Sequence, residues 1–491
     1  MKTALLWIAL LLLLSPKFEA QTPVVNQTTS SAKKMLEKSA MEADFNVLVN
    51  ALKEVHGGLH RFVSAAELDK RLALHKQKIN ASKSQLEFIS ILSETLAEVR
   101  DGHLRLEYDE QTYAELASAR LFPLRLAIED KKAIVVFNDT PQDNGVQPGM
   151  ELVAINGHAI PELVSIMLKK IGGDGFVETG KLRNLERSFA TYYWLFVDQS
   201  PVFELTLRKQ DNSSLMIKLD GVLNKERALN RSNNPVNKAA LSNFIIPGTQ
   251  KININLDFLQ DEKIAYLSVR SFDVDDFKPK LDSAMQTIRN KAPKALILDL
   301  RGNGGGVDQY GAYLVAQFVD HSFRYFESIH LKSIDPSFTK WKPKTYEDLK
   351  NGTLPDGKGE YLVSEKLHDG IGNQMPASHP FKGKLIVLVN GGTFSTAADA
   401  SAILQSLKRA IFVGEETGGT SEGNTSGLNA KIVMPNSGLN VKIHMYGYWN
   451  AIKNHQKGRG VIPAYLVDNT INDLIQGIDA QKNKAIELAK K

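Results

Sequence analysis

The stretch ALILDLRGNGGGV, Ala295–Val307, combines the pattern of a buried strand with four glycines in five positions. Glycine tolerates positive φ and is costly inside a helix or strand, so a turn must follow the strand. Backbone N–H groups exposed in such a turn can hold an anion or an oxyanion. A phosphate loop is excluded in detail, because neither the Walker pattern nor the Rossmann glycine spacing is present. A purely structural turn remains the alternative.

Strand and helix patterns alternate on both sides of this turn. Strand-like runs occur in KIAYLSV, KALILDL, KLIVLVN and AIFVGEE, and helix-like runs separate them, as in DDFKPKLDSAMQTIRN and QYGAYLVAQFV. Such alternation is typical of an α/β core with parallel strands. We therefore expect an α/β core over residues 262–491 that ends in a C-terminal helix.

Ser395 lies at the second informative junction, in VNGGTFSTAADASAIL, Val389–Leu404. A strand pattern ends at a short turn, and an Ala-rich helix pattern follows. Serine is a favoured N-cap, because its hydroxyl accepts a hydrogen bond from the first turn of a helix. The nucleophile-elbow pattern G-x-S-x-G is absent. The stretch alone is therefore compatible with a capping serine or with a nucleophile.

The N-terminus predicts export. Lys2, the apolar run Ala4–Leu14 and Ala20 follow the layout of a secretory signal peptide, which we place at residues 1–20. The apolar run is too short to span a bilayer, and no later run is long and apolar enough to do so. The chain has 491 residues and no cysteine, so it folds without disulfides. We expect a soluble protein of the periplasm or the exterior.

Three further regions precede the core. Helical periodicity predicts an N-terminal helical domain over residues 21–118. Residues 119–222 carry strand and turn patterns, including GVQPGMELVAINGHAI, and resemble a PDZ domain with an insert over Lys169–Leu195. Residues 223–261 are polar and are predicted to be a linker.

The charge and composition of the chain limit the classes of molecule that we expect it to bind. The formal net charge of +5 is small for 491 residues, and no basic block is interleaved with aromatic residues. Nucleic acid is therefore not an expected partner.

Four motifs in order, DLRGNGGG, TFSTAADA, VGEETGG and GRGVIP, resemble the C-terminal-processing/tricorn family of serine peptidases. The run DGHLRLEY near Asp101 resembles the tricorn-type branch, whose catalytic His lies upstream of a PDZ-like module. The resemblance implies a ClpP/crotonase-like α/β core and a hydrolase that needs no cofactor and no metal.

The resemblance also implies roles for individual residues. Ser395 matches the nucleophile and His103 the general base, so their side chains should lie within roughly 3–4 Å of each other. The backbone N–H groups of Thr396 and of a glycine in Gly304–Gly305 match the oxyanion hole. In a second branch of the family a Lys is the base, but Thr420 stands at that position here.

The third catalytic member is missing from its usual place. The tricorn branch has a Glu shortly before the segment that reads GRGVIPAY here, and this chain has none there. An amide can still orient the imidazole, as Asn does in papain-like enzymes. We expect Gln456 in this role, with Asn454, Glu415 and Glu416 as the alternatives.

The sequence thus predicts an exported serine endopeptidase that acts on peptides or unfolded chain ends. A non-catalytic ligand- or peptide-binding protein on the same fold is the main alternative, and a hydrolase of non-peptide esters is another. A metal enzyme is a distant possibility, because HGGLH, His56–His60, has the two-His spacing of a helical zinc site. Its two glycines weaken that helix, and no Glu follows the first His.

Overall fold

The computed structural model describes residues 34–129, 132–243, 253–260 and 263–491. The predicted signal peptide lies outside the described residues. Residues Met35–Lys491 form one compact unit.

A six-stranded sheet forms the predicted α/β core. The strand order is β12-β13-β14-β20-β21-β24, parallel throughout except for β12, which pairs antiparallel with β13. The parallel arrangement predicted for the core strands is confirmed. The strands are β12 (Ile254–Leu259), β13 (Ile264–Val269), β14 (Ala295–Asp299), β20 (Lys384–Val389), β21 (Ile411–Gly414) and β24 (Tyr465–Leu466).

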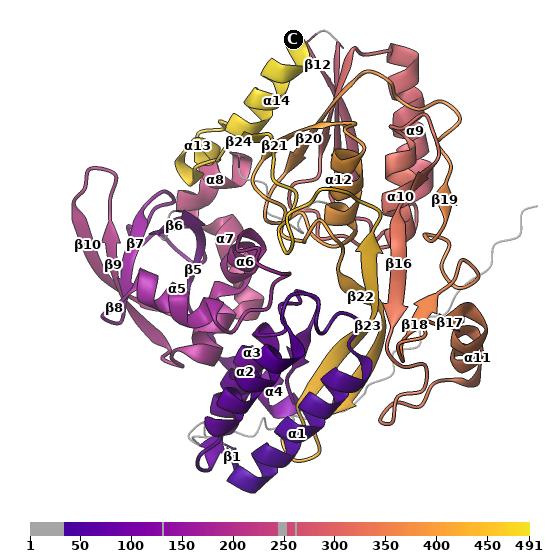
Figure 1. Ribbon diagram of the computed structural model, residues 1–491. Helices are drawn as coiled ribbons and strands as arrows, with labels where there is room; N and C mark the ends of the chain where they lie inside the picture. The colour runs from indigo at the N-terminus through magenta and orange to yellow at the C-terminus, as the bar shows by residue number, and fades with distance from the viewer. Residues whose placement is uncertain (1–33, 130–131, 244–252, 261–262) are drawn as a thin grey trace, which may run out of the picture. The chain divides into compact units, whose positions relative to one another are not determined.

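Both faces of this sheet are covered by helices, which explains its nearly continuous apolar strands. Alternate residues such as Leu296 and Val387 pack under α9 (Phe277–Lys291), α10 (Asp308–Ala316) and α12 (Thr396–Ser406). Their neighbours Ile297 and Ile386 pack under the C-terminal helix α14 (Ala480–Lys490) on the other face. Figure 1 shows α14 and the α9–α10 pair on opposite sides of the sheet.

A second sheet extends from the core and carries a strand from the N-terminal region. Its order is β17-β18-β16-β23-β22, and β3 (Arg105–Glu107) pairs antiparallel with β23. The other members are β16 (Phe326–Leu331), β17 (Thr353–Pro355), β18 (Tyr361–Val363), β22 (Thr425–Val433) and β23 (Asn440–Asn450). The β3–β23 pairing attaches the segment just after His103 to the C-terminal half of the chain.

The region of residues 119–222 contains an antiparallel sheet of order β10-β9-β7-β6-β5, with β8 attached to β7. Strands next to each other in the sequence pair antiparallel, β5 with β6 and β9 with β10. Two helices accompany the sheet, and α6 lies within the predicted insert. The elements are β5 (Leu124–Glu129), β6 (Lys132–Asn138), β7 (Glu151–Ile155), β8 (His158–Ala159), α5 (Ile160–Leu168), α6 (Thr179–Phe196), β9 (Val202–Arg208) and β10 (Ser214–Asp220).

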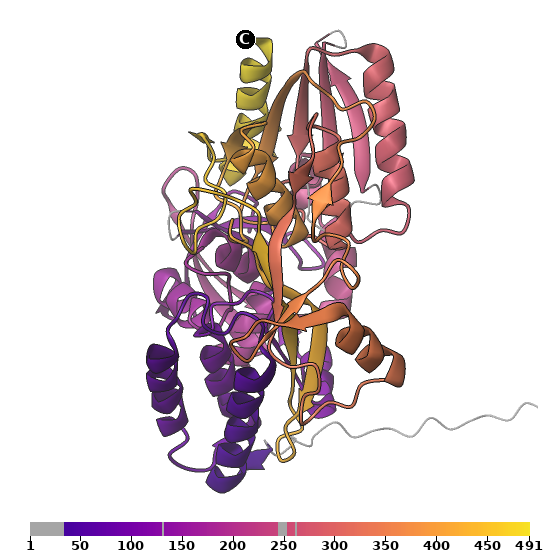
Figure 2. The same ribbon diagram turned by 45° about the vertical axis from the view of Figure 1, so that its right-hand side comes forward.

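Helices dominate the N-terminal region, as the periodicity predicts. They are α1 (Lys38–Val55), α2 (Ala65–Gln77), α3 (Gln85–Ala97) and α4 (Glu110–Ser118). Ser84 and Glu87 form a capping box that starts α3, so this boundary is set by local sequence. In Figure 2 the indigo helix α1 lies beside the yellow β22–β23 hairpin, and the two share one hydrophobic core.

The stretch 223–261, predicted to be a linker, contains regular structure in its described part: α7 (Arg227–Asn233), α8 (Lys238–Asn243) and β12. Arg227 and Arg231 both form ion pairs with Asp139, whose side chain is fully buried at the end of β6. This stretch is polar because it forms short helices at the surface. The ion pairs with Asp139 fix α7 to the sheet.

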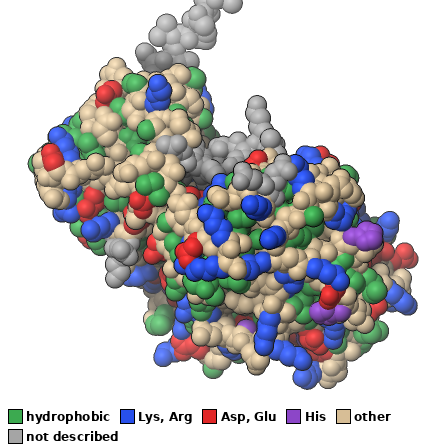
Figure 3. Space-filling model, turned by 90° about the horizontal axis from the view of Figure 1, so that it is seen from above, with side chains coloured by type: hydrophobic (Ala, Val, Ile, Leu, Met, Phe, Trp, Pro, Cys, Tyr) green, Lys and Arg blue, Asp and Glu red, His purple; other side chains and the backbone are tan. Residues whose placement is uncertain are grey.

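The remaining elements are short. They are β1 (Met35–Leu36), β2 (Lys83–Ser84), β4 (Arg120–Leu121), β11 (Val222–Leu223), β15 (Phe323–Arg324), α11 (Pro343–Gly352), β19 (Asn373–Gln374), α13 (Ile471–Ile475) and two single 3₁₀ turns at Asn224–Glu226 and Pro235–Asn237. Within the described residues, no helix combines the length and apolarity needed to cross a membrane. Basic, acidic and hydrophobic side chains are mixed on the face seen in Figure 3.

The Asp139 cluster yields a stability prediction. Asp139→Ala leaves two arginines without their buried counter-ion and should lower the free energy of unfolding by about 3–5 kcal/mol. Glu226→Ala, an exposed change on the same segment, should stay within about 0.5 kcal/mol. Urea unfolding followed by circular dichroism measures both. Equal stabilities of the two variants would mean that Asp139 does not fix α7 to the sheet.

Candidate active site

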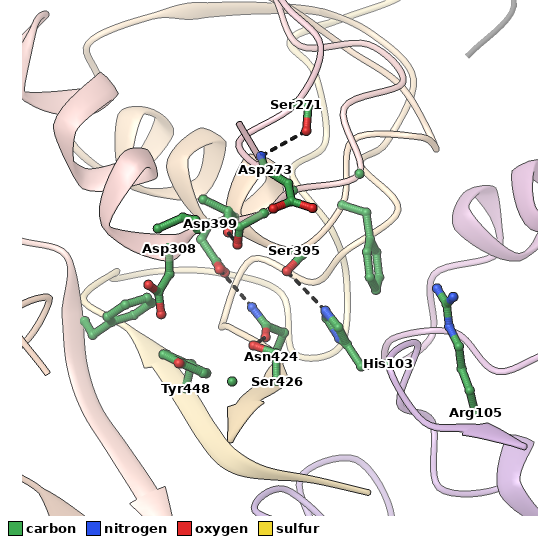
Figure 4. Close-up of a pocket in the computed structure, with 18 of the residues that line it drawn as sticks. His103, Arg105, Ser271, Asp273, Asp308, Ser395, Asp399, Asn424, Ser426 and Tyr448 are labelled. Atoms are coloured by element: carbon green, nitrogen blue, oxygen red, sulfur yellow. Dashed lines mark hydrogen bonds between the residues drawn. The ribbon is translucent and has the colours of Figure 1, made fainter. Parts of the chain in front are cut away.

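Ser395 occupies the N-cap position of α12 without capping the helix. Its side chain makes no hydrogen bond with the first turn, and its backbone has φ 53° and ψ −130°. Positive φ at a non-glycine residue is costly and concentrates at functional sites. The hydroxyl instead lies 3.1 Å from Nε2 of His103, a distance within the expected range (Figure 4). The serine hydroxyl therefore faces an imidazole rather than the helix, so Ser395 is not a capping serine.

His103 reaches Ser395 from a turn that its neighbours hold tightly. The carboxylate of Asp101 accepts the backbone N–H of His103 at 2.7 Å, and Asp174 accepts that of Gly102 at 2.7 Å. The imidazole packs on the ring of Phe394 with a centroid separation of 4.6 Å. A Cβ on Gly102 would lie 2.8 Å from that ring, so the close approach requires glycine. The turn thus fixes the ring between Phe394 and two carboxylates.

Asp101 is the acid closest to the second ring nitrogen of His103. Its Oδ1 lies 3.7 Å from Nδ1, which is an ion-pair distance and longer than a hydrogen bond. Its Oδ2 lies 2.8 Å from Nε2 of the fully buried His56. Because Nδ1 of His56 accepts the N–H of Gly58 at 3.1 Å, the proton of His56 must be on Nε2 and is donated to Asp101. His56 therefore holds the carboxylate in place.

A second carboxylate, that of Asp174, also acts on His103. Burial raises the pKa of Asp174 to about 6. Burial opposes protonation of His103, but the carboxylates of Asp101 and Asp174 outweigh it and raise the pKa of His103 above its ordinary value. Burial lowers the pKa of the neighbouring His444 to about 4, so that ring stays neutral. The local electrostatics favour a proton on His103.

The structure corrects the prediction for the third member of the site. Gln456 is exposed, and no hydrogen bond among the described residues joins it to His103. Asn454 is exposed as well. Glu415 forms an ion pair with Arg183 and Glu416 with Arg459, so both acids hold loops. Asp101 was missed because its role depends on a fold contact, although its position two residues before His103 was a visible signal.

The HGGLH motif does not form a metal site. His56 is buried against Asp101, whereas His60 is exposed. Among the described residues, two other groups have donor atoms near enough to share a cation: the set Asp101, His103 and Asp174, and the set His330, Asp356 and Glu360. The first set consists of His103, the candidate general base, and the two acids next to it.

The glycine loop packs directly against Ser395. The Gly305 N–H donates to Oδ1 of Asn303 at 2.9 Å, so this amide already has an acceptor. A Cβ on Gly305 would lie 2.7 Å from Cβ of Ser395, and its φ is 98°. The N–H groups of Gly304 and Thr396 have no acceptor among the described residues. Of the three residues expected in the oxyanion hole, Gly305 therefore supplies space, and the other two retain available donors.

The glycine loop and the serine loop are joined by several hydrogen bonds. The N–H of Phe394 donates to the Asn303 carbonyl at 2.9 Å. The hydroxyls of Thr393 and Thr396 donate to the carbonyls of Leu300 and Gly306, each at 2.9 Å. These bonds hold Ser395 and the candidate oxyanion donors together.

Ser395 and His103 open into a cavity of about 720 Å³. Figure 4 shows Asp308, Asp399 and Tyr448 on one side of Ser395, and His103 and Arg105 on the other. Ser395 lies beside the imidazole of His103, close to backbone N–H groups and at the wall of a cavity. This combination suits acyl transfer.

Comparisons with known proteins agree with this arrangement. Residues 263–467 match the family model described as Peptidase family S41. The crystal structure of mature CPAF is similar with a TM-score of 0.63 and 13% identity, covering 92% of this chain and 97% of that chain. Mature CPAF complexed with lactacystin gives a TM-score of 0.64 and 14% identity over 92% and 98% of the two chains. No curated protein matches the sequence.

At these identities the likeness to CPAF shows the fold alone, which is a mixed α/β fold of the S41 type. The family follows from the match over the core, which includes the glycine loop and Ser395. The resemblance drawn from the motifs is confirmed over the core: residues 263–467 match peptidase family S41, the serine peptidases of the C-terminal-processing and tricorn type.

Proposed function

We propose that this protein is an exported serine endopeptidase in which Ser395 is the nucleophile and His103 the general base. The observation that carries the proposal is the 3.1 Å contact between Oγ of Ser395 and Nε2 of His103, made by a serine that does not cap its helix. Export rests on the signal-peptide layout of residues 1–20. The fold assignment that accompanies it is a ClpP/crotonase-like core with a PDZ-like module over residues 119–222.

The proposed reaction proceeds in two acyl-transfer steps. Nε2 of His103 accepts the Ser395 proton as Oγ attacks the scissile carbonyl carbon. The resulting oxyanion accepts hydrogen bonds from the N–H groups of Thr396 and Gly304. His103 then gives its proton to the leaving amine, and an acyl-enzyme forms. Water, deprotonated by His103, hydrolyses the acyl-enzyme and restores the serine.

Asp101 is the proposed positioning residue for the base. The imidazole becomes a cation in both steps, and a carboxylate 3.7 Å from Nδ1 stabilises that cation. His56 donates to the other oxygen of Asp101 and keeps it aimed at the ring. Asp174 contributes charge from a second direction. This arrangement replaces the Glu that the family resemblance led us to seek near Gly460.

Labelling of the nucleophile tests the proposal directly. A fluorophosphonate probe should label the wild type and fail to label Ser395→Ala. His103→Ala should lower turnover of a fluorogenic unfolded protein by about a thousandfold or more, because the base is lost. Lys457→Ala is the matched control, an exposed change that should leave both readouts intact. A binding protein on the same fold would show no labelling and no turnover even as wild type.

The pH profile tests the role of Asp101. Activity requires neutral His103, so kcat/KM should fall as the pH drops through a pKa above the ordinary histidine value of about 6.5. Asp101→Asn removes a group that stabilises the imidazolium, which lowers that pKa. The acidic limb should therefore move to lower pH while the plateau drops. Asp320→Asn, an exposed control, should shift neither. An unmoved limb in Asp101→Asn would reduce Asp101 to a purely structural role.

The glycine loop provides a paired test of fit. Gly305→Ala places a methyl group against Ser395 at a position with positive φ, so kcat should fall by about a hundredfold or more. Gly304→Ala keeps its N–H and meets no atom within 4 Å, so kcat should stay within a few-fold of wild type. Thermal unfolding by circular dichroism verifies that both variants fold. Wild-type activity in Gly305→Ala would contradict the assigned close packing.

A further inference from the structure

The part of the cavity beyond Ser395 is lined by acidic and aromatic side chains. Asp308 is the first residue of α10, which directly follows the glycine loop, and Asp399 lies one turn after Ser395 on α12. Both line the cavity together with Phe326 and Tyr448. In Figure 4 Asp308, Asp399 and Tyr448 lie on the side of Ser395 away from His103. We call the four residues Asp308, Asp399, Phe326 and Tyr448 the acidic pocket.

Asp308 is held at the cavity wall by His368. Its Oδ2 lies 2.8 Å from Nε2 of His368, which donates a hydrogen bond to it. Nδ1 of His368 accepts the N–H of Gly370 at 3.1 Å, which orients the ring toward Asp308. Burial raises the pKa of Asp308, but the hydrogen bond and the charge interaction with His368 outweigh it and leave the pKa below its ordinary value. The pocket therefore favours the charged form of this carboxyl.

Asp399 adds a second acid that is almost completely buried. Its two oxygens accept hydrogen bonds from the side-chain amides of Asn424 and Asn450, each at 2.8 Å. These donors are neutral, and burial raises the pKa of Asp399 to about 7. A cation brought next to this group would remove much of that penalty.

No Lys or Arg among the described residues forms an ion pair with Asp308 or Asp399. Arg61, a buried cation, donates to the Tyr448 carbonyl at 2.7 Å instead. Buried acids normally have a cationic or metal partner, because an isolated buried charge is expensive. Asp399 is such a buried acid, and the half-buried Asp308 lines the same cavity beside Ser395, so a cation on the substrate can pair with both.

The walls of the acidic pocket suit a long side chain with a charged tip. The rings of Phe326 and Tyr448, whose centroids are 4.8 Å apart, line the cavity, although little of either residue is exposed. Lysine and arginine bury an apolar stem against such rings and place the cation at polar groups beyond them.

The opposite end of the cavity carries the opposite charge. Arg105 and Lys442 line it and are direct cross-strand partners of β3 and β23, so two cations face each other. This end repels a basic side chain. A basic substrate side chain is therefore favoured in the acidic pocket over the end of the cavity at Arg105 and Lys442.

We propose that the acidic pocket binds the side chain of the residue whose carbonyl is attacked, and that the enzyme cleaves after lysine or arginine. The glycine loop that faces the oxyanion continues directly into Asp308, which places the pocket next to the attacked carbonyl. This inference rests on the proposed peptidase function and adds a substrate class to it.

Fluorogenic peptides that differ only at the cleaved residue test the inference. Lys, Arg, norleucine and Glu are compared at that position, norleucine being the uncharged counterpart of Lys. The wild type should cleave after Lys or Arg with a kcat/KM about a hundredfold or more above norleucine, because the pocket's carboxylates would be left without a cation. Glu should be the poorest substrate.

Two isosteric variants separate specificity from folding and catalysis. Asp308→Asn and Asp399→Asn should each lower the Lys-to-norleucine ratio about tenfold or more, whereas Asp320→Asn should leave it unchanged. The ratio is internal to each protein, so a partly folded variant does not alter it. Benzamidine should inhibit the wild type competitively and Asp308→Asn more weakly.

The outcomes also distinguish a failure of the proposed specificity from a failure of the proposed peptidase function. A wild type that is labelled at Ser395 but cleaves after norleucine as fast as after Lys would overturn the acidic pocket and leave the peptidase intact. An unchanged Lys-to-norleucine ratio in both Asn variants would overturn it as well. Absence of labelling in the wild type would remove the proposed function itself.

Discussion

The candidate site depends on the pairing of β3 with β23. Only three residue pairs join these strands, yet they bring His103 to a serine that is 292 positions later in the chain. The turn before β3 is held by contacts from separate parts of the chain: His56 at the end of α1 fixes Asp101, and Asp174 holds Gly102. His103 and Ser395 therefore meet only when the N-terminal helices, the region of residues 119–222 and the core have all folded together.

The same interactions set the electrostatics. Asp101 receives a proton donor from His56 on one oxygen and faces the imidazole with the other, so its negative charge is both stabilised and directed. In a buried environment such a charge acts strongly, because little water screens it. Catalytic electrostatics are most effective when the groups are fixed before the reaction begins. The buried neighbours of His103 provide that fixation without any group that must move.

The sequence predicted the core well because its signals are local. Apolar runs such as Leu385–Val389 are covered on both faces, and glycines mark the turns between strands and helices. Ser395 and His103 came from motif resemblance, since no local rule links residues so distant. The third position was sought near Gly460, whereas the acid closest to Nδ1 of His103 is Asp101. That choice depends on His56 and on β23, which are contacts that the chain order does not reveal.

The second sheet shows a missed signal of a different kind. In β23 the residues Val441, Ile443 and Met445 are buried and alternate with more exposed ones, which is the period-two pattern of a strand. This strand could have been predicted from the sequence. Its partner β3 could not, because a strand of three residues carries too little pattern to be recognised. The acidic pocket was equally inaccessible, since Asp308 and Asp399 follow different strands and share a cavity only after the sheet has formed.

The geometry of Ser395 ties these observations together. A non-glycine residue at positive φ costs about 1–3 kcal/mol and persists only where its surroundings overdetermine it. Here the surroundings are the glycine loop, which is joined to the serine loop through Asn303, Leu300 and Gly306. Gly305 contributes by the absence of a side chain, since any Cβ would meet Ser395. The backbone strain at Ser395 and the packing of the glycine loop thus depend on the same contacts. A change that relaxes the strain must therefore also alter the packing that fixes the neighbouring amides.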